Sequence, residues 1–431
     1  MLKMDVCLIG RLHIQLFHLG GLFVHSFQPV FLLQYIEINL FVRGRFNMNS
    51  QRWLSLNFFT FFFTWGVFLP YWTGWLIDAK YLSVPEAGFI MSAGMIVRAM
   101  STLFLYPIST KLYSMSKVMQ MFGILSLVAI LFYLPFDSYV MLLIVTILFS
   151  AIYPNILPAM ESSASILITT DKIHYGKARA FGSLGYTFAL VVVGAVTQIF
   201  GINSVLWVMI IGLAIIIISQ SLQVPAALKE KPEKINVGEQ KYTYKDLLQE
   251  KGFLVVLFIS ILLQGAHAAY YNYGYVFLDD LNVAGFTIGL ILNVAVIIEI
   301  IIFANADRFF SKMNVSTMYL IAGVGSTLRW VMILLFPSVA VFIVSQLLHA
   351  VSFGIAHYAF IQYISNKLKP ALIPMAQAVY AAFGMSLSVA VLTMLGGYLY
   401  EIEPQYAFGG MLICTVPAII ITLLTMKKYK Y

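Results

Sequence analysis

Residues 225–251 read PAALKEKPEKINVGEQKYTYKDLLQEK, the longest hydrophilic stretch of this chain. On each side of it lie apolar runs long enough to cross a lipid bilayer, a length of about twenty residues each. We find six such runs before the stretch and six after it. A segment this rich in charges of both signs predicts a solvated linker, over 223–251, between two halves of a polytopic membrane protein.

The apolar runs define the expected membrane spans. We place them, with limits uncertain by several residues, at 53–77, 85–109, 118–136, 139–160, 178–200, 203–222, 252–278, 284–305, 315–336, 338–363, 375–399 and 406–426. The expected fold class is therefore an all-α membrane protein with twelve transmembrane helices. Its domains are a six-helix bundle over 48–222 and a second six-helix bundle over 252–431.

Composition and charge agree with a membrane setting. Hydrophobic residues make up 61% of the chain and charged residues only 10%, and the formal net charge is +8. The basic residues alternate from loop to loop and do not gather on one face, which argues against a nucleic-acid partner and for a sidedness signal. We expect a bacterial-type inner-membrane protein with both termini in the cytoplasm.

The loops differ in charge between the two sides. On the side of the linker they hold Lys111, Lys177, Arg308, Lys367 and Lys427 among other cations, whereas the opposite side holds Lys80. Acidic residues mark the opposite loops instead: Asp78, Asp137, Asp279, Asp280, Glu401 and Glu403. This asymmetry supports an even number of spans.

The first 47 residues do not continue this pattern. They mix His, Gln and Gly with apolar residues and never sustain a clean span, and Met48 begins a plausible start, MNSQRWLSL. We interpret 1–47 as an upstream extension, the alternative being an amphipathic or targeting segment. With Cys7 in this segment and Cys414 in the last span, no disulfide framework is indicated.

Three charged residues lie inside apolar spans: Arg98, Glu299 and Arg329. A charge in the bilayer interior is costly and usually marks a polar pathway between helices. Glu299 and Arg329 stand on consecutive spans, where their attraction would offset part of this cost. For Arg98 we favour a structural ion pair between helices over contact with a ligand.

Two further charges flank a short loop. Glu161 is expected to close the fourth span and Arg179 to open the fifth. The two side chains either form a pair, bind a substrate between them, or are ordinary interfacial charges.

Titratable and aromatic side chains extend the candidate site. His349 and His357 are eight residues apart on the tenth span and face broadly the same side, where histidines suit proton transfer near neutral pH. The seventh span reads LLQGAHAAYYNYGYVF and brings His267 and Tyr270 together in an aromatic stretch that would suit a ring-shaped substrate. The alternatives are hydrogen-bonded packing for the histidines and an interfacial aromatic belt for the outer tyrosines.

These residues resemble a known family. Two six-helix halves joined by a charged linker match the plan of the major facilitator superfamily, in which the halves enclose a site near the midplane and rock around it. Within it, the chain from about Arg52 onward is similar to the proton-coupled 3-phenylpropionic acid transporters, which are themselves similar to lactose permease. The residues that carry the similarity are RWLSLNFFTFFFTWGVFLPYWTGWL, YGKARAFGS, LLQGAHAAYY, EIIIFA, LRW and QAVYAAFGMSLSVAVLTMLGGYLYE.

The resemblance implies roles for single residues. Similarity to lactose permease places Glu161 and Arg179 at its substrate-binding pair and Tyr186 at its ring-stacking Trp. It places Glu299, Arg329 and His349 in its coupling network. Two departures matter, because Ser352 stands where the permease has its proton-carrying Glu, and Gln346 stands where it has a Lys.

The expected function is import of a small organic solute with protons, most simply an aromatic carboxylate such as 3-phenylpropionate. Glu299 is the expected proton carrier, with His349 or His357 as alternatives. Arg179 or Arg329 would receive the substrate carboxylate, and Tyr186 and Tyr270 would cover its ring. A sugar or nucleoside proton symporter is the alternative.

The partners implied are a small-molecule substrate and the lipid bilayer, with the monomer as the working unit. No cofactor or metal is expected, since a proton gradient supplies the driving force. The sequence contains no GxxxxGK, HExxH or GxSxG motif that would favour an enzyme. It also lacks a re-entrant filter or a soluble signalling domain, which argues against a channel or receptor.

Overall fold

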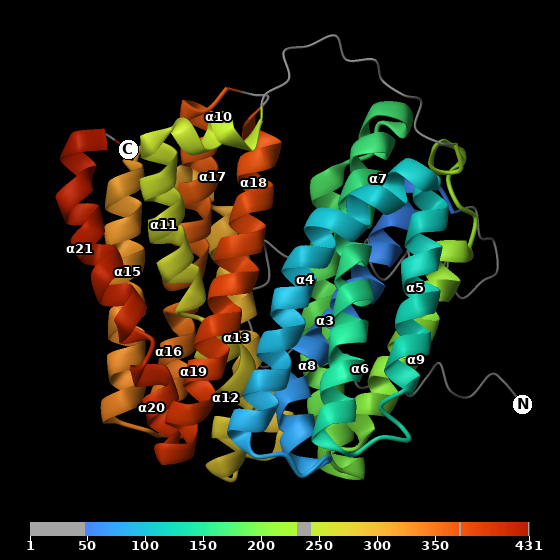
Figure 1. Cartoon of the computed structure of the whole chain (residues 1–431), viewed down its shortest axis with the longest axis horizontal. Coiled ribbons are helices and arrows are strands. Elements are labelled where there is room, and N and C mark those ends of the chain that lie inside the picture. Colours follow the sequence, from blue (N-terminus) through green and yellow to red (C-terminus); the bar gives the residue numbers. More distant parts are fainter. Residues whose placement is uncertain (1–47, 231–242, 370–371, 430) are drawn as a thin grey trace, which may run out of the picture. The chain divides into compact units, whose positions relative to one another are not determined.

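The computed structural model describes residues 48–230, 243–369, 372–429 and 431. The predicted extension over 1–47 and the middle of the linker, 231–242, lie outside these residues. Throughout the described ranges the regular structure is helical, with no strand. The helices are labelled in chain order from α3 in Figure 1.

The helices before the linker are α3 (Ser50–Asp78), α4 (Val84–Leu112), α5 (Met115–Leu131), α6 (Tyr139–Ile152), η1 (Tyr153–Asn155), α7 (Ile156–Asp171), α8 (Tyr175–Phe200) and α9 (Ser204–Ser221). In the linker lie η2 (Ala226–Leu228) and α10 (Tyr244–Gln249). The helices of the second half are α11 (Lys251–Gly265), α12 (Ala268–Asp280), α13 (Gly285–Ala304), α14 (Ala306–Phe310), α15 (Val315–Leu335), α16 (Val339–Leu347), η3 (Ala350–Ile355), α17 (Ala356–Lys367), α18 (Ile373–Ala382), η5 (Phe383–Leu387), α19 (Ser388–Ile402), α20 (Pro404–Gly409) and α21 (Leu412–Tyr429).

Several of these helices join end to end into one membrane span. Counted this way, the described residues contain 11 helical segments long and apolar enough to cross a membrane, and a shorter apolar helix, Met115–Leu131. This last helix coincides with the third expected span, so the structure accounts for all the apolar runs of the sequence. The prediction of an all-α membrane protein is confirmed.

Local sequence signals explain where some helices begin. Helix α4 starts at a capping box in which Ser83 and Glu86 satisfy each other's backbone groups, with Pro85 in the first turn. The short linker helix α10 starts in the same way with Thr243 and Asp246. Hydrogen bonds from the backbone N–H and the hydroxyl of Thr243 hold the pKa of Asp246 below its ordinary value.

One helix end differs from the expected limits. The fourth span was expected to end near Glu161, but α7 continues to Asp171. It ends there because Lys172 adopts a left-handed conformation (φ 52°) and its N–H bonds back to the Leu167 carbonyl. Glu161 therefore lies in the middle of α7 and is not at its end.

Small residues allow the first helices to approach closely. A Cβ built on Gly185 of α8 would lie 2.2 Å from the carbonyl oxygen of Phe59 of α3, so only glycine fits at this crossing. Close approach at glycine is a general means of packing helices in membranes, where no hydrophobic effect drives them together. Helices α3 and α8 thereby form the centre of the first half.

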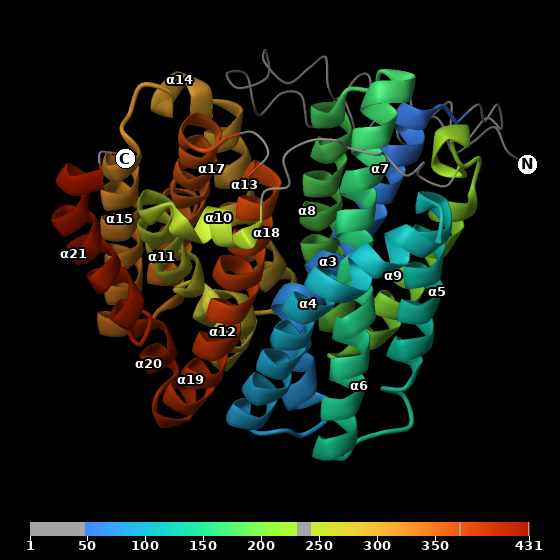
Figure 2. The same ribbon diagram turned by 45° about the horizontal axis from the view of Figure 1, so that its top comes forward.

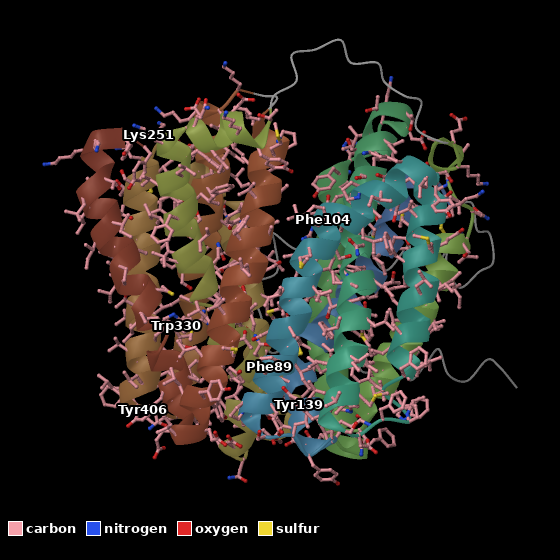
Figure 3. The ribbon with its side chains drawn as sticks, in the orientation of Figure 1. Phe89, Phe104, Tyr139, Lys251, Trp330 and Tyr406 are labelled. Atoms are coloured by element: carbon pink, nitrogen blue, oxygen red, sulfur yellow. The ribbon has the colours of Figure 1, made fainter. Side chains whose placement is uncertain are left out.

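The two halves contact each other through α3 with α12, α4 with α19, and α8 with α13. We call the end of the molecule near α10 and Lys251 the linker end, and the opposite end, near Tyr139 and Tyr406, the far end (Figures 1 and 3). The turned view in Figure 2 shows α4 and α19 side by side, in agreement with their packing.

Contacts between the halves concentrate toward the far end. On α8, which runs from the linker end at Tyr175 to the far end at Phe200, the bonded positions are Thr187 and Gln198. Thr187 accepts a bond from Asn293 Nδ2 at 3.2 Å, and Gln198 accepts one from the Phe286 N–H at 3.1 Å. Glu161, Arg179 and Glu299, discussed next, lie on the linker side of these contacts.

Candidate functional site

In the second half, three of the predicted residues form a chain of polar contacts. Arg329 Nη1 lies 3.0 Å from His349 Nδ1, and His349 Nε2 lies 3.4 Å from Glu299 Oε2. The residues come from α15, from the turn before η3, and from α13. Sequence reasoning expected Arg329 and Glu299 to attract each other directly, whereas the structure places His349 between them.

This arrangement decides which nitrogen of His349 carries its proton. A guanidinium has only donors, so His349 Nδ1 must be the acceptor from Arg329. Neutral His349 then carries its hydrogen on Nε2 and donates toward the Glu299 carboxylate. A second proton on His349 would have to occupy Nδ1, where it would face the Arg329 cation. Glu299, by contrast, has a second carboxylate oxygen with no hydrogen-bond partner among the described residues, and its side chain is 28% exposed.

Arg329 itself is enclosed by protein. Its guanidinium carbon lies 4.7 Å from the ring centre of Tyr270 and 4.5 Å from that of Trp330, and Nη2 donates to Gln346 Oε1 at 3.2 Å. The residue has no exposed surface. In Figure 3, the neighbouring Trp330 lies within the second half, between the two ends of the molecule. Arg329 thus holds His349 in place but does not reach a cavity in this conformation.

His267 and Ser352 lie behind this chain. His267 Nδ1 donates to the Leu263 carbonyl at 3.0 Å, and Nε2 lies 3.0 Å from Ser352 Oγ. His267 is completely buried, at 0% exposure. One ring nitrogen thus bonds within the seventh span and the other links this span to the tenth.

His357 lies farther along the same span. Its Nδ1 is 3.0 Å from the Tyr380 hydroxyl, and its ring stacks on Phe353 at 6.1 Å between ring centres. Phe353 stacks in turn on His349 at 5.5 Å. The predicted common face of His349 and His357 is thus bridged by an aromatic ring. Between the two histidines the helix contains the π-helical turn η3, an irregularity often found at functional sites.

In the first half, Glu161 and Arg179 lie together as a pair. Arg179 Nε is 3.7 Å from Glu161 Oε1, and the Tyr175 hydroxyl donates to Glu161 Oε2 at 2.8 Å. Both charged side chains are more than one-third exposed, so their mutual attraction is weakened by solvent. Arg179 also lies over the rings of Phe62, at 4.1 Å, and Phe58, at 5.7 Å.

The two halves of the site face each other. Arg179 of the first half is close enough to Glu299 and His357 of the second half to interact electrostatically with both. Tyr186 is half-buried on α8, where it packs against Gly66 of α3. The sequence-predicted residues from α7, α8, α13 and the tenth span therefore surround one region between the halves.

Arg98 is placed differently from the sequence expectation. Its guanidinium lies 4.7 Å from the ring centre of Trp65. Within the described residues no carboxylate pairs with it, so the expected structural ion pair is not found.

Sequence reasoning did not predict two contacts of the site, although it named Gln346 as a departure from lactose permease. Tyr175 bonds to Glu161, and Gln346 bonds to Arg329. Both lie at helical spacing from a residue that was singled out, Tyr175 four before Arg179 and Gln346 three before His349, so the spacing itself was a usable signal. Tyrosine and glutamine are not by themselves typical of a functional site, so their role was identified from the tertiary contacts.

Comparison with known proteins now identifies the chain. Residues 51–409 match the model of the MFS_1 like family. The chain belongs to this family. Among curated proteins, it is 27% identical over 375 residues to the probable 3-phenylpropionic acid transporter of Escherichia coli (strain K12), covering 86% of this chain and 97% of that protein. It is also 26% identical over 384 residues to the maltose permease of Geobacillus stearothermophilus, covering 86% of this chain and 94% of that protein.

Solved structures show the same fold. The nucleoside transporter NupG superposes with a TM-score of 0.74 at 16% sequence identity, covering 89% of this chain and all of that one. A POT family transporter superposes with a TM-score of 0.65 at 13% identity, covering 88% and 96% of the two chains. This MFS_1 like protein is a secondary transporter of the major facilitator fold, and its relatives are transporters, not enzymes. It is a multi-pass membrane protein that carries a small-molecule substrate.

Proposed function

We propose that this MFS_1 like protein is a proton symporter that imports a small aromatic carboxylate, with 3-phenylpropionate as the first candidate. The observation that carries the proposal is the contact between Glu299 and His349, in which a half-buried carboxylate stands at the end of a chain of fixed donors. The relative described as a probable 3-phenylpropionic acid transporter supports the substrate class.

Glu299 is the proton carrier in this proposal. Arg329 occupies the acceptor nitrogen of His349, so a proton entering the chain is best accommodated on the carboxylate. Protonation neutralises the Glu299 carboxylate. A neutral side chain costs less free energy than a charged one when the apolar helices close around it. Release of the proton on the opposite side restores the charge and resets the carrier.

The described conformation is one end state of the transport cycle. The halves are in contact toward the far end, with Glu161, Arg179 and Glu299 on the linker side of these contacts. If the linker lies in the cytoplasm, as the loop charges indicate, this is the inward-facing state of an inner-membrane protein with cytoplasmic termini. A single chain holds the whole site, so the monomer is the proposed working unit.

A sugar or nucleoside proton symporter is the second candidate. It is favoured by the partly exposed Glu161–Arg179 pair, which presents both acceptors and donors suited to hydroxyl groups. Maltose permease is among the relatives, and NupG is among the structures with this fold. Under the first proposal the same pair positions Tyr175 and the aromatic face of α3 beside the substrate ring.

The test of proton coupling uses Glu299→Gln in proteoliposomes. We expect the variant to lose accumulation driven by a proton gradient while retaining counterflow exchange within about twofold of the wild type, because exchange does not require net proton movement. Glu401→Gln, an exposed carboxylate at the far end, is the matched control and should retain both activities. Equal loss of accumulation and exchange in Glu299→Gln would assign Glu299 to substrate binding or to structure.

A further inference from the structure

Of the arginines placed among the site helices, Arg98 differs in having no polar partner. Arg179 pairs with Glu161, and Arg329 donates to His349 and Gln346. For Arg98, the part of the chain that the structure describes offers neither an ion pair nor a hydrogen bond, only the face of Trp65 at 4.7 Å. Arg98 is partly exposed, but a charge without a polar partner inside an apolar span is still costly, and such local costs are most often retained at functional sites.

A cavity lies beside this guanidinium. It has a volume of about 20 Å³ between α3, α4 and α6, and Arg98, Trp65, Phe68, Met95 and Ser150 are among the residues that line it. This volume holds about one water molecule. The cavity therefore fits one oxygen of an anionic head group in this conformation, whereas a ring must lie outside it.

A second donor points to the same ligand chemistry. Ser150 is 4% exposed and lines the cavity, and none of the described residues hydrogen-bonds to its hydroxyl. The other hydroxyl of the lining, that of Thr146, is already engaged with the Leu142 carbonyl and with Tyr133. Because Ser150 lines the cavity, its hydroxyl is available to donate to a ligand or a water molecule there. One guanidinium and one free hydroxyl form a donor set suited to a carboxylate.

The cavity also lies on the face of α3 that points toward the Glu161–Arg179 pair. Phe62 and Trp65 are three residues apart and share one helix face. Arg179 lies over Phe62, and Arg98 lies over Trp65. Arg98 is thus one helical turn along the same aromatic face from the Glu161–Arg179 pair, and a flat ring placed on this face would direct its acid group toward Arg98.

We infer that Arg98 and Ser150 form the subsite for the substrate carboxylate, and that the aromatic ring of the substrate lies along Phe62 and Trp65. The inference rests on the proposed function and makes it more specific. It replaces Arg179 and Arg329 as carboxylate receivers, because the first already faces the Glu161 carboxylate and the second is enclosed by Tyr270 and Trp330.

The test compares a carboxylate with a neutral molecule of the same shape. Binding of 3-phenylpropionate and of 3-phenylpropan-1-ol is measured by calorimetry on the purified full chain. We expect Arg98→Gln to weaken 3-phenylpropionate by about 10- to 100-fold, the range for loss of a hydrogen bond to a charged group. Binding of the alcohol should change by less than about twofold, Arg98→Lys should recover part of the loss, and Ser150→Ala should weaken the acid alone.

Two controls separate binding from structure. Lys111→Gln removes a cation from an exposed position of the same helix and should leave both affinities unchanged. The Tm of Arg98→Gln should be equal to or above that of the wild type, because the change removes an uncompensated charge. A lowered Tm with equal loss of both ligands would show a structural role and overturn the inference.

The remaining outcomes are also decisive. Wild-type affinity for 3-phenylpropionate in Arg98→Gln would overturn the carboxylate subsite while leaving the proposed function intact. A wild-type protein that neither binds nor transports aromatic acids would contradict the proposed function itself, and the assignment of Arg98 with it.

Discussion

At the scale of single residues, the proposed proton coupling depends on the orientation of one imidazole ring. Arg329 fixes His349 as an acceptor at Nδ1, and this leaves Nε2 to donate to Glu299. The ring therefore links the buried guanidinium of Arg329 to the carboxylate of Glu299 through one contact at each nitrogen. His349 in this account orients the carrier and does not itself carry the proton.

This account predicts different effects for two substitutions of His349. His349→Phe leaves Arg329 Nη1 and Glu299 without their partner and should lower stability by about 1–3 kcal/mol, the cost of an unsatisfied buried polar group. His349→Asn keeps a side-chain oxygen that accepts from Arg329 and should recover most of the Tm. Neither variant should accumulate substrate, because the donor toward Glu299 is lost or displaced.

The measurement is the Tm of each purified variant, paired with uptake driven by a proton gradient. Wild-type Tm and wild-type accumulation in His349→Phe would show that the chain from Arg329 to Glu299 has no role in stability or coupling.

These residues were predictable from the sequence only in part. Glu299, Arg329 and His349 were identifiable because charged and titratable groups are rare in apolar spans. Their order of contact was not, since which of three side chains lies between the other two depends on how α13, α15 and η3 pack. Arg98 shows the same limit, because its expected ion pair required a carboxylate, and none of the described residues pairs with it in the tertiary structure.

At the scale of helices, the contact of α8 with α13 closes the far end. A Cβ on Gly289 would lie 2.3 Å from the carbonyl oxygen of Leu190. Backbone atoms on both sides cannot give way as a flexible side chain would. Gly289→Ala should therefore separate the helices here and favour opening of the far end.

A single engineered thiol reports this opening. Thr197→Cys, at a buried position of α8 at the closed end, should react with a membrane-impermeant maleimide several-fold faster when combined with Gly289→Ala than without it, in a background with Cys7→Ala and Cys414→Ala. Gly176→Ala on the same helix is the control, because a Cβ there meets nothing within 4 Å. Equal labelling of the two glycine variants would mean that the α8–α13 contact does not govern closure.

Helix existence was predictable from the apolar runs, whereas helix irregularities were not. The apolar pattern located the spans, and Ser83 with Glu86 marks a start by capping chemistry. The π-helical turns η3 and η5 add a local change of helical register inside continuous apolar sequence, which leaves the hydropathy unaltered. The extension of α7 beyond Glu161 was missed because residues 162–171 mix polar with apolar side chains. The apolar run therefore ends before the helix does.

At the scale of the whole molecule, the fold follows from the number of apolar runs and from one charged linker. Membrane-spanning backbone must satisfy its hydrogen bonds within helices, so runs of about twenty apolar residues leave few alternatives. Matches to the MFS_1 like family and to NupG confirm the major facilitator fold. The substrate depends instead on a small number of side chains in the region between the halves.

The most direct test of the central claim is uptake of radiolabelled 3-phenylpropionate into proteoliposomes with an imposed inward proton gradient. The assay is run with and without an uncoupler and challenged with unlabelled lactose and nucleosides. We predict accumulation that the uncoupler abolishes, that aromatic acids displace, and that sugars and nucleosides leave unchanged. Absence of 3-phenylpropionate uptake, together with gradient-driven uptake of a sugar or nucleoside, would contradict the proposal and assign this fold to the second candidate function.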